Sequence, residues 1–317
     1  MSSGDATTAG VVESRVVDVG GIPMSALFRE VERPRAVIVA LHGGAARAAY
    51  FHVPGLPAQS LLRTGAALGF TVIALDRPGY GASASHADRM TRAERRVYLA
   101  YAAVDRLIGS RGRGAGVFVM AHSLGSVLAL RMAADERGAG LLGVELAGTG
   151  RRHHPRSVEI LRARLEDRPQ SDGGRFGLRD LLWTPERLYP EDVVGRAAIV
   201  SPTPGYESVE VRTWAQEFPG VAARVRVPVR YCLGDHELVW DPNPQAMAEM
   251  AAMFTASPRV VVDRQAHGPH NLSLARSAAA YHLKVLSFVE ECVLARVDAG
   301  PAGDRAAAAD DAAAPGR

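Results

Sequence analysis

The sequence contains little lysine and little cysteine, and it has no long hydrophobic run. Lys284 is the only lysine among 37 basic residues, an arginine bias that we interpret as compositional rather than functional. Against 34 acidic residues, the formal net charge is only +3 over 317 residues. So small a surplus does not indicate a surface for nucleic acid or a membrane, and we expect neither as a partner.

The scarcity of cysteine and the lack of an apolar leader limit the cellular setting. Cys232 and Cys292 are too few for a disulfide framework or a zinc site built from cysteines. Residues 1–10 are small and polar, unlike a secretory signal, and no apolar run reaches the roughly 18–20 residues that span a bilayer. We therefore expect a cytoplasmic protein with reduced thiols.

What the sequence does contain is an alternation of short apolar strands with helical patterns. Residues 36–41 (AVIVAL) are continuously apolar, as expected of a strand buried on both faces of a parallel sheet. Residues 16–19 and 24–28 are typical of a β-hairpin. Further strands are predicted at residues 71–75, 117–120, 141–146, 227–233 and 259–262, and helices at 58–68, 92–108, 124–134, 244–254 and 274–294. This order predicts an α/β fold with a doubly wound, mostly parallel sheet.

The alternation is interrupted once, and both ends of the chain lack it. Residues 151–222 carry arginine, proline and scattered aromatic residues. We interpret them as a helical cap inserted between strands six and seven of a core formed by residues 13–150 and 223–297. Residues 1–12 have no periodic pattern and residues 298–317 have no bulky apolar side chain, so both are predicted to be disordered.

Ser123 lies where a predicted strand turns directly into a predicted helix. Small residues, Ala121 and Gly125, stand two positions before and two positions after it. A turn this tight needs small flanking residues, and it exposes the serine oxygen at the N-terminus of the helix, as a nucleophile requires. The short motif also occurs by chance around a serine that only caps a helix, but the strand–turn–helix context favours the nucleophile.

A glycine pair, Gly43-Gly44, follows the first predicted parallel strand and allows the backbone to approach a ligand closely. A tetrahedral oxyanion needs two donors, and the N–H of Leu124, next after the predicted nucleophile, supplies one. We predict that the N–H of Gly44 supplies the other, with Ala45 as the alternative. The neighbouring His42 and His122 are more typical of histidines that hydrogen-bond the backbone than of a base.

A serine nucleophile also needs a histidine base held by a carboxylate. Asp235 and Glu237 both follow a predicted strand and both fit the acid, and periodicity does not decide between them. His267 and His270 both precede the last helix, and imidazole is the base whose ordinary pKa lies near neutrality.

A zinc site is the competing interpretation of the histidines. It would combine His267 and His270 with the His153-His154 pair. No cysteine and no Glu-x-x-His spacing supports it, so we expect neither a metal nor a cofactor.

The order of these motifs, each at the end of a strand, resembles the α/β-hydrolase superfamily in its esterase and thioesterase branches. The resemblance covers residues 16–294, and residues 76–81 (DRPGYG) look like the Asp-x-x-Gly-x-Gly turn common in that family. The family carries its lid where residues 151–222 lie. The resemblance therefore implies the α/β-hydrolase fold with a cap insertion.

The resemblance also bears on the two ambiguities. The family's acid usually sits in a Gly-x-x-Asp/Glu arrangement, which here falls on Glu237 and leaves Asp235 second. Its histidine usually lies in a Gly-His-Asn turn before the last helix. His270 fits this turn with one inserted residue, Pro269, which makes His267 the second candidate for the base. Ala121 in place of the usual glycine, and glutamate in place of the commoner aspartate, are departures that do not suggest an inactive enzyme.

The resemblance implies a serine hydrolase in which Ser123 attacks an acyl carbonyl, His270 takes its proton and Glu237 holds the imidazole. The implied substrate is a carboxylic ester, thioester or lactone of a small hydrophobic acyl group, free or bound to a carrier. Two alternatives stay open: the same triad could transfer or cyclise the acyl group or cleave a C–C bond, or the fold could serve as a non-catalytic binding module.

Aromatic side chains are the predicted contacts of a hydrophobic acyl group, although they could equally pack the inserted segment onto the core. We assign substrate binding to Tyr80, Trp183, Tyr189 and Trp214. Arg151, Arg152 and Arg156 could bind a carboxylate or phosphate of a carrier, and a solvated basic loop is the alternative.

Overall fold

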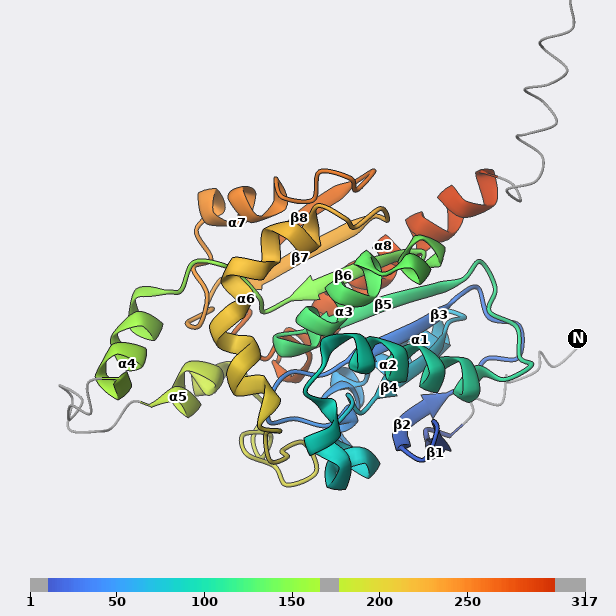
Figure 1. Cartoon of the computed structure of the whole chain (residues 1–317), viewed down its shortest axis with the longest axis horizontal. Coiled ribbons are helices and arrows are strands. Elements are labelled where there is room, and N and C mark those ends of the chain that lie inside the picture. Colours follow the sequence, from blue (N-terminus) through green and yellow to red (C-terminus); the bar gives the residue numbers. More distant parts are fainter. Residues whose placement is uncertain (1–10, 166–176, 300–317) are drawn as a thin grey trace, which may run out of the picture.

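This computed structural model describes residues 11–165 and 177–299. Eight strands of these residues form one sheet in the order β1-β2-β4-β3-β5-β6-β7-β8 (Figure 1). The strands are β1 Glu13–Asp18, β2 Pro23–Arg29, β3 Val37–Leu41, β4 Thr71–Leu75, β5 Val117–His122, β6 Gly143–Ala147, β7 Val229–Gly234 and β8 Val260–Gln265. Strands β1 and β2 form an antiparallel hairpin, and β2 also pairs antiparallel with β4. The other six strands, β4, β3, β5, β6, β7 and β8 in their order across the sheet, are parallel.

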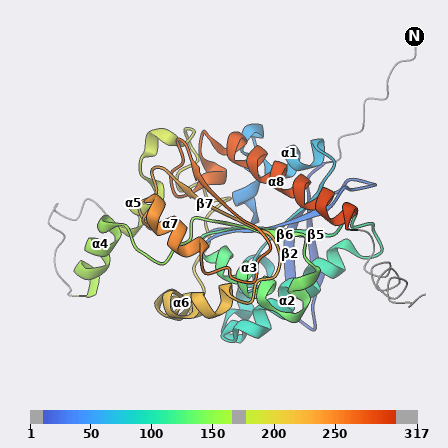
Figure 2. The ribbon, with the colours of Figure 1, turned by 90° about the horizontal axis from the view of Figure 1, so that it is seen from above.

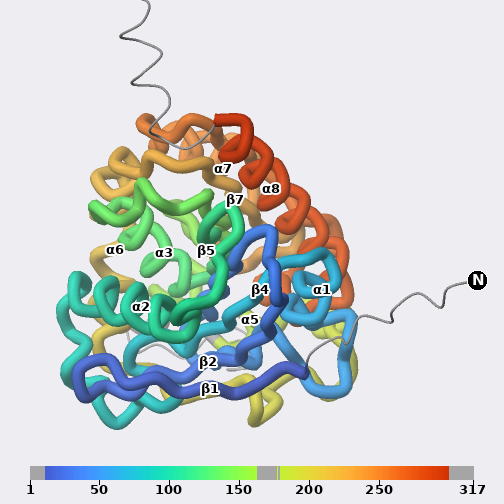
Figure 3. Tube along the Cα trace, turned by 90° about the vertical axis from the view of Figure 1, so that its right-hand side faces the viewer, coloured from blue at the N-terminus to red at the C-terminus, as the bar shows by residue number. Residues whose placement is uncertain are grey.

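Helices cover both faces of this sheet. The helices of the described residues are α1 Leu61–Ala67, α2 Ala93–Ile108, α3 Leu124–Ala134, α4 Pro155–Leu165, α5 Leu178–Trp183, α6 Tyr206–Ala222, α7 Pro244–Ala251 and α8 Ala278–Asp298. In Figures 2 and 3, α1 and α8 lie on one side of the strands, and α2, α3 and α6 lie on the other. The predicted fold class, a doubly wound and mostly parallel α/β sheet, is confirmed.

The apolar run of residues 36–41 contains the central strand β3. All five of its residues are buried. Because successive side chains of a strand point to opposite faces, Val37 and Val39 join the apolar cluster under α2 and α3, whereas Ile38 and Ala40 join the cluster under α1 and α8. A strand with both faces covered needs apolar residues at every position.

The segment between β6 and β7 contains α4, α5 and α6. Helix α6 packs against α3, whereas α4 extends away from the sheet (Figures 1 and 2). The segment also touches the core near the end of β3, where Ala46 forms an isolated bridge with Val200. Residues 166–176, within this segment, lie outside the described residues.

The last helix differs from its predicted limits of residues 274–294. Helix α8 begins at Ala278, because Leu272–Leu274 form a separate short 3-10 turn, and it continues to Asp298. Apolar character continues through the turn, so a pattern of apolar residues alone does not mark the break. Of the ends predicted to be disordered, residues 1–10 and 300–317 lie outside the described residues.

Within residues 11–165 and 177–299, the search for a helix both long and apolar enough to cross a membrane finds none.

Candidate active site

The predicted site residues gather at the carboxyl ends of the parallel strands. The loops that follow β3, β5, β7 and β8 carry the glycine pair, Ser123, the two candidate acids and the two candidate bases. In parallel α/β sheets this edge is where helix N-termini and strand ends meet, and ligands bind there. Motifs spread over more than 200 residues of chain thus reach one place.

Ser123 occupies a strained turn between β5 and α3. Its backbone has φ +50° and ψ −123°, a conformation that costs free energy in any residue with a side chain. Gly125 explains part of the motif, because a Cβ there would lie 2.3 Å from the carbonyl oxygen of Leu41. Helix α3 therefore starts so close to β3 that only glycine fits, and the turn presents the serine oxygen above the sheet.

The structure brings Ser123, His270 and Glu237 into one hydrogen-bonded row. The Nε2 atom of His270 lies 3.3 Å from Oγ of Ser123. On the other side of the ring, Nδ1 lies 2.8 and 2.9 Å from the two carboxylate oxygens of Glu237. Both His270 and Glu237 are 1% exposed, so the carboxylate holds the imidazole away from bulk water. This arrangement can orient the ring and stabilise its protonated form.

The alternative acid and the alternative base have other places. The carboxylate of Asp235 accepts hydrogen bonds from the backbone N–H groups of His267 and Gly268, at 3.0 and 2.9 Å. His267 itself is exposed and has φ +53°. Asp235 therefore fixes the loop that carries His270, whereas Glu237 contacts the imidazole.

His122, beside the serine, supports His270 through its backbone. Its Nε2 donates to the carbonyl oxygen of His270 at 2.8 Å, and its ring stacks on Tyr50 with 4.7 Å between centroids. The pKa of His122 lies well below its ordinary value, mainly because the ring is buried and also because His270 is nearby. The ring is therefore neutral, with its proton on Nε2, as a structural hydrogen-bond donor requires.

The predicted oxyanion donors lie against the nucleophile turn. Leu124 is the first residue of α3, and a Cβ on Gly44 would lie 2.9 Å from the Leu124 side chain. The N–H of Ala45, the alternative donor, is already engaged by the hydroxyl of Tyr80 at 3.2 Å. The geometry therefore favours Gly44 over Ala45 as the partner of Leu124.

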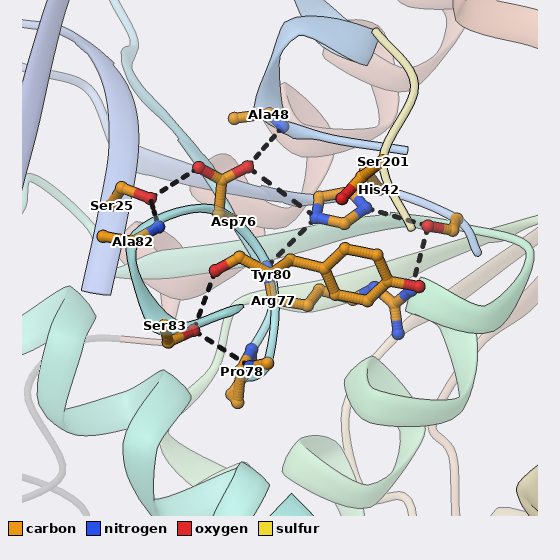
Figure 4. A network of polar contacts seen from close by, with 12 residues as sticks. Ser25, His42, Ala48, Asp76, Arg77, Pro78, Tyr80, Ala82, Ser83 and Ser201 are labelled. Atoms are coloured by element: carbon orange, nitrogen blue, oxygen red, sulfur yellow. Dashed lines mark hydrogen bonds and ion pairs between the residues drawn. The ribbon is translucent and has the colours of Figure 1, made fainter. Parts of the chain in front are cut away.

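A buried polar network surrounds the loop that follows β3 and carries Gly43 and Gly44 (Figure 4). His42 contacts the carbonyl oxygen of Gly43 through Nδ1 at 2.8 Å and accepts the backbone N–H of Arg77 through Nε2 at 3.1 Å. Because the carbonyl can only accept, Nδ1 must carry the proton. Burial and the Arg77 charge hold the pKa of His42 well below its ordinary value, which keeps this tautomer neutral. Asp76 completes the network by accepting the hydroxyl of Ser25 at 2.6 Å.

A cavity of about 340 Å³ opens beside Ser123. It is largely apolar, as small-molecule sites usually are. The segment between β6 and β7 supplies much of its wall: Leu161, Leu182, Thr203, Glu207, Val211 and Trp214. The core adds Tyr50, Val127 and Trp240 beside the serine and His270.

Of the four aromatic residues assigned to substrate binding, Trp214 borders this cavity and the other three do not. Tyr189 lies behind Leu182, to whose carbonyl its hydroxyl donates at 2.9 Å, and Trp183 packs on the Tyr189 ring. Tyr80 is fully buried, and its hydroxyl donates to Glu207 at 2.8 Å. Sequence patterns identify aromatic residues, but they do not distinguish a cavity wall from the layer behind it.

The arginines at the start of the inserted segment are engaged by the protein. Arg151 donates to the carbonyl oxygen of Ala215 at 3.3 Å, and Arg152 forms an ion pair with Asp241 at 2.8 Å. Arg156 lies 3.5 Å from Glu159. These arginines do not line the cavity beside Ser123.

Two residues at the site carry no signal in the sequence. Glu207 lies in the first turn of α6 among other glutamates of that helix, yet it is 1% exposed and borders the cavity. Trp240 follows the candidate acid by three positions and stacks on His153 with 4.5 Å between centroids. Both become recognisable only when the segment between β6 and β7 is folded against the sheet.

Comparison with known sequences gives one family. The model of the alpha/beta hydrolase family matches residues 38–286 of the chain. A search of curated proteins gives no significant match.

Several solved structures are similar to the chain in fold. A thermostable carboxyl esterase from Bacillus coagulans has a TM-score of 0.61 and 19% identity, over 90% of this chain and 99% of that one. A monoglyceride lipase from Saccharomyces cerevisiae has 0.63 and 13%, over 92% and 99%. The thioesterase domain of the curacin biosynthetic pathway has 0.53 and 16%, over 88% and 99%. At these identities the likeness is one of fold.

Proposed function

The chain belongs to the alpha/beta hydrolase family, and from that premise we propose that it is a serine hydrolase of carboxylic esters, thioesters or lactones with a small hydrophobic acyl group. The observation that supports this most directly is the row of Ser123, His270 and Glu237, with 3.3 Å between Oγ and Nε2 and 2.8 Å between Nδ1 and the carboxylate. A nucleophile, a base and an orienting acid are the groups that acyl transfer through a serine ester needs.

The proposed reaction proceeds through an acyl-enzyme. His270 takes the proton of Ser123 as Oγ attacks the acyl carbonyl, and the N–H groups of Gly44 and Leu124 stabilise the oxyanion. The protonated imidazole, held by Glu237, then gives its proton to the leaving alcohol or thiol. Water, activated by the same imidazole, attacks the acyl-enzyme and regenerates the serine. The Oγ–Nε2 distance of 3.3 Å is long for a hydrogen bond, and such contacts commonly shorten when substrate binds.

We propose that residues 151–222 act as a cap that selects the acyl group. Leu161, Leu182, Val211 and Trp214 bring apolar surface from α4, α5 and α6 to the cavity beside Ser123. An apolar wall of this kind favours a hydrophobic acyl chain over a charged one, because a charge would lose its water without gaining a partner.

A cytoplasmic location and a carrier-bound substrate belong to the same proposal. Cys232 and Cys292 are buried free thiols, as expected in a reducing compartment. A carrier-bound thioester would reach Ser123 only if its long arm entered the cavity from the surface.

Two measurements test the proposed function. A fluorophosphonate probe should label the wild-type protein covalently, and Ser123→Ala should abolish the labelling. A series of p-nitrophenyl esters and acyl thioesters of rising chain length should show hydrolysis that the same variant loses. An unlabelled wild-type protein with no activity on either series would contradict the proposal. If the acyl group instead passes to an added amine faster than to water, the enzyme is an acyl transferase.

A further inference from the structure

We propose that Glu207, on helix α6, is a positioning residue for the oxyanion hole. It acts through Arg77, which holds the peptide group that carries the Gly44 N–H, and through Tyr80, which holds the next peptide group. The inference rests on the proposed function, because an oxyanion hole matters only if Ser123 attacks a carbonyl. It assigns a task to a buried carboxylate that the triad does not use.

The carboxylate of Glu207 is buried and has two side-chain partners from a distant loop. One oxygen lies 2.6 Å from the Arg77 guanidinium, and both residues of this ion pair are at most 2% exposed. The other oxygen accepts the hydroxyl of Tyr80 at 2.8 Å. A buried carboxylate needs such partners, and a buried guanidinium needs the carboxylate in return. The three side chains therefore form one unit.

Arg77 fixes the peptide group between Gly43 and Gly44. Its guanidinium donates to the carbonyl oxygen of Gly43 at 2.9 Å, and His42 Nδ1 donates to the same oxygen at 2.8 Å. In a planar trans peptide the C=O and the following N–H point in opposite directions. Holding the Gly43 carbonyl toward Arg77 and His42 therefore aims the Gly44 N–H away from them.

Tyr80 fixes the next peptide group. Ala45 has φ +52°, a conformation that residues other than glycine adopt only when their surroundings hold them there. Its N–H donates to the Tyr80 hydroxyl at 3.2 Å, and its carbonyl oxygen accepts the N–H of Ser201 at 2.9 Å. The Tyr80 hydroxyl in turn donates to Glu207, so its orientation depends on that carboxylate. The peptide group that carries the Gly44 N–H and the one that follows it are thus both anchored.

The same helix provides a matched comparison. Glu210 lies one turn further along α6, is also buried, and forms an ion pair with the buried Arg96. The Arg96 guanidinium donates to the carbonyl oxygens of Met90 and Thr91, which belong to another loop. Glu210 therefore shares the residue type, the burial and the kind of partner with Glu207, but it has no contact with the oxyanion loop.

The experiment compares Glu207→Gln with Glu210→Gln in hydrolysis of p-nitrophenyl butyrate. Loss of one oxyanion donor lowers kcat by about 10² to 10³-fold, so partial misplacement of one should cost about 10 to 100-fold in Glu207→Gln. KM should stay within about twofold, because the oxyanion forms only in the transition state. Glu210→Gln should keep kcat within about twofold, although both variants should lower the melting temperature.

A second pair guards against a Glu207 variant that fails to fold. Tyr80→Phe removes only the hydroxyl that links Glu207 to Ala45. Tyr101→Phe is its control, since that buried hydroxyl donates to the carbonyl oxygen of Met132, far from the site. Inhibition by butylboronic acid, which forms a tetrahedral adduct with serine, should weaken in Tyr80→Phe and Glu207→Gln by the same factor as kcat/KM.

Different failures point to different errors. If the Glu207 and Glu210 variants lose the same activity, or if Tyr80→Phe keeps full kcat and boronate affinity, the positioning role is wrong while the proposed function stands. If the wild-type protein is neither labelled by a fluorophosphonate nor active on the ester, the proposed function fails and the inference falls with it.

Discussion

The buried histidines near Ser123, which are His42, His122 and His270, differ in their hydrogen-bond partners. Both ring nitrogens of His270 face polar side chains, the Ser123 hydroxyl and the Glu237 carboxylate. His42 and His122 each donate one ring proton to a backbone carbonyl instead. A histidine that bonds to the backbone is fixed in one tautomer, whereas one between a hydroxyl and a carboxylate can take up and release a proton.

The first prediction separates the candidate bases. His270→Ala should lower kcat/KM by about 10⁴-fold or more, because it removes the imidazole that faces the Ser123 hydroxyl. His267→Ala should change kcat/KM by no more than about twofold, because that side chain is exposed. Steady-state hydrolysis of one p-nitrophenyl ester measures both. A large loss in His267→Ala with activity kept in His270→Ala would reverse the assignment.

The second prediction concerns pH and His282, a histidine outside the site. It is fully buried, its Nε2 lies 3.0 Å from the Ser273 hydroxyl, and burial lowers its pKa to about 3. Between this value and the unfolded value of about 6.5, the unfolded chain binds one more proton. The free energy of unfolding should therefore fall as the pH drops below 6.5, by about 1.4 kcal/mol per pH unit from this residue.

Urea unfolding at pH 7, 6 and 5 checks this dependence. His282→Gln keeps a polar group near Ser273 but does not titrate. The free energy of unfolding of this variant should therefore change with pH less steeply than that of the wild-type protein, by about 1.4 kcal/mol per pH unit. Equal slopes in the wild-type protein and the variant would show that His282 is protonated equally in both states.

At the scale of an element, the close approach of α3 to β3 determines the shape of the turn at Ser123. The third prediction is that Gly125→Ala destabilises the protein by about 1–3 kcal/mol and lowers kcat, since its Cβ would lie 2.3 Å from the Leu41 oxygen and the helix would have to shift. Gly140→Ala is the control, because nothing lies within 4 Å of a Cβ there. Thermal unfolding and ester hydrolysis would contradict the idea if the two variants behaved alike.

Elements differ in how well the sequence predicts them, and the reason is physical. Strand β4 and helix α3 match their predicted limits, because each has a sharp change of pattern at both ends. Helix α8 does not, because apolar residues continue through the preceding turn. The contacts of Glu207 with Arg77 and Tyr80 join positions some 130 residues apart, and no local pattern encodes such a pairing.

Across the whole molecule, a charge network crosses the sheet away from the site. Arg230 on β7 lies 2.8 Å from the carboxylate of Glu145 on β6 and also pairs with Asp263 on β8. Glu145 is fully buried and accepts the hydroxyl of Tyr281 from α8 at 3.0 Å. The network joins three strands and one helix, and its central pair, Arg230 and Glu145, is buried.

The fourth prediction follows from that burial. Arg230→Met should lower the free energy of unfolding by about 3–5 kcal/mol, because it leaves the Glu145 carboxylate without its cation. Adding Glu145→Gln should recover part of the loss, since an uncharged amide is cheaper to bury. Urea unfolding of the single and double variants measures both effects. A double variant less stable than Arg230→Met alone would contradict this account.

The bond between Glu207 and Arg77 also limits how this protein can be recombined with its relatives. Exchanging residues 151–222 for the corresponding segment of another alpha/beta hydrolase would remove the carboxylate but leave the buried guanidinium behind. Such a chimera would carry an unpaired cation next to the Gly43-Gly44 loop. A designer would have to replace Arg77 and Tyr80 together with the segment, so the unit of exchange is larger than residues 151–222.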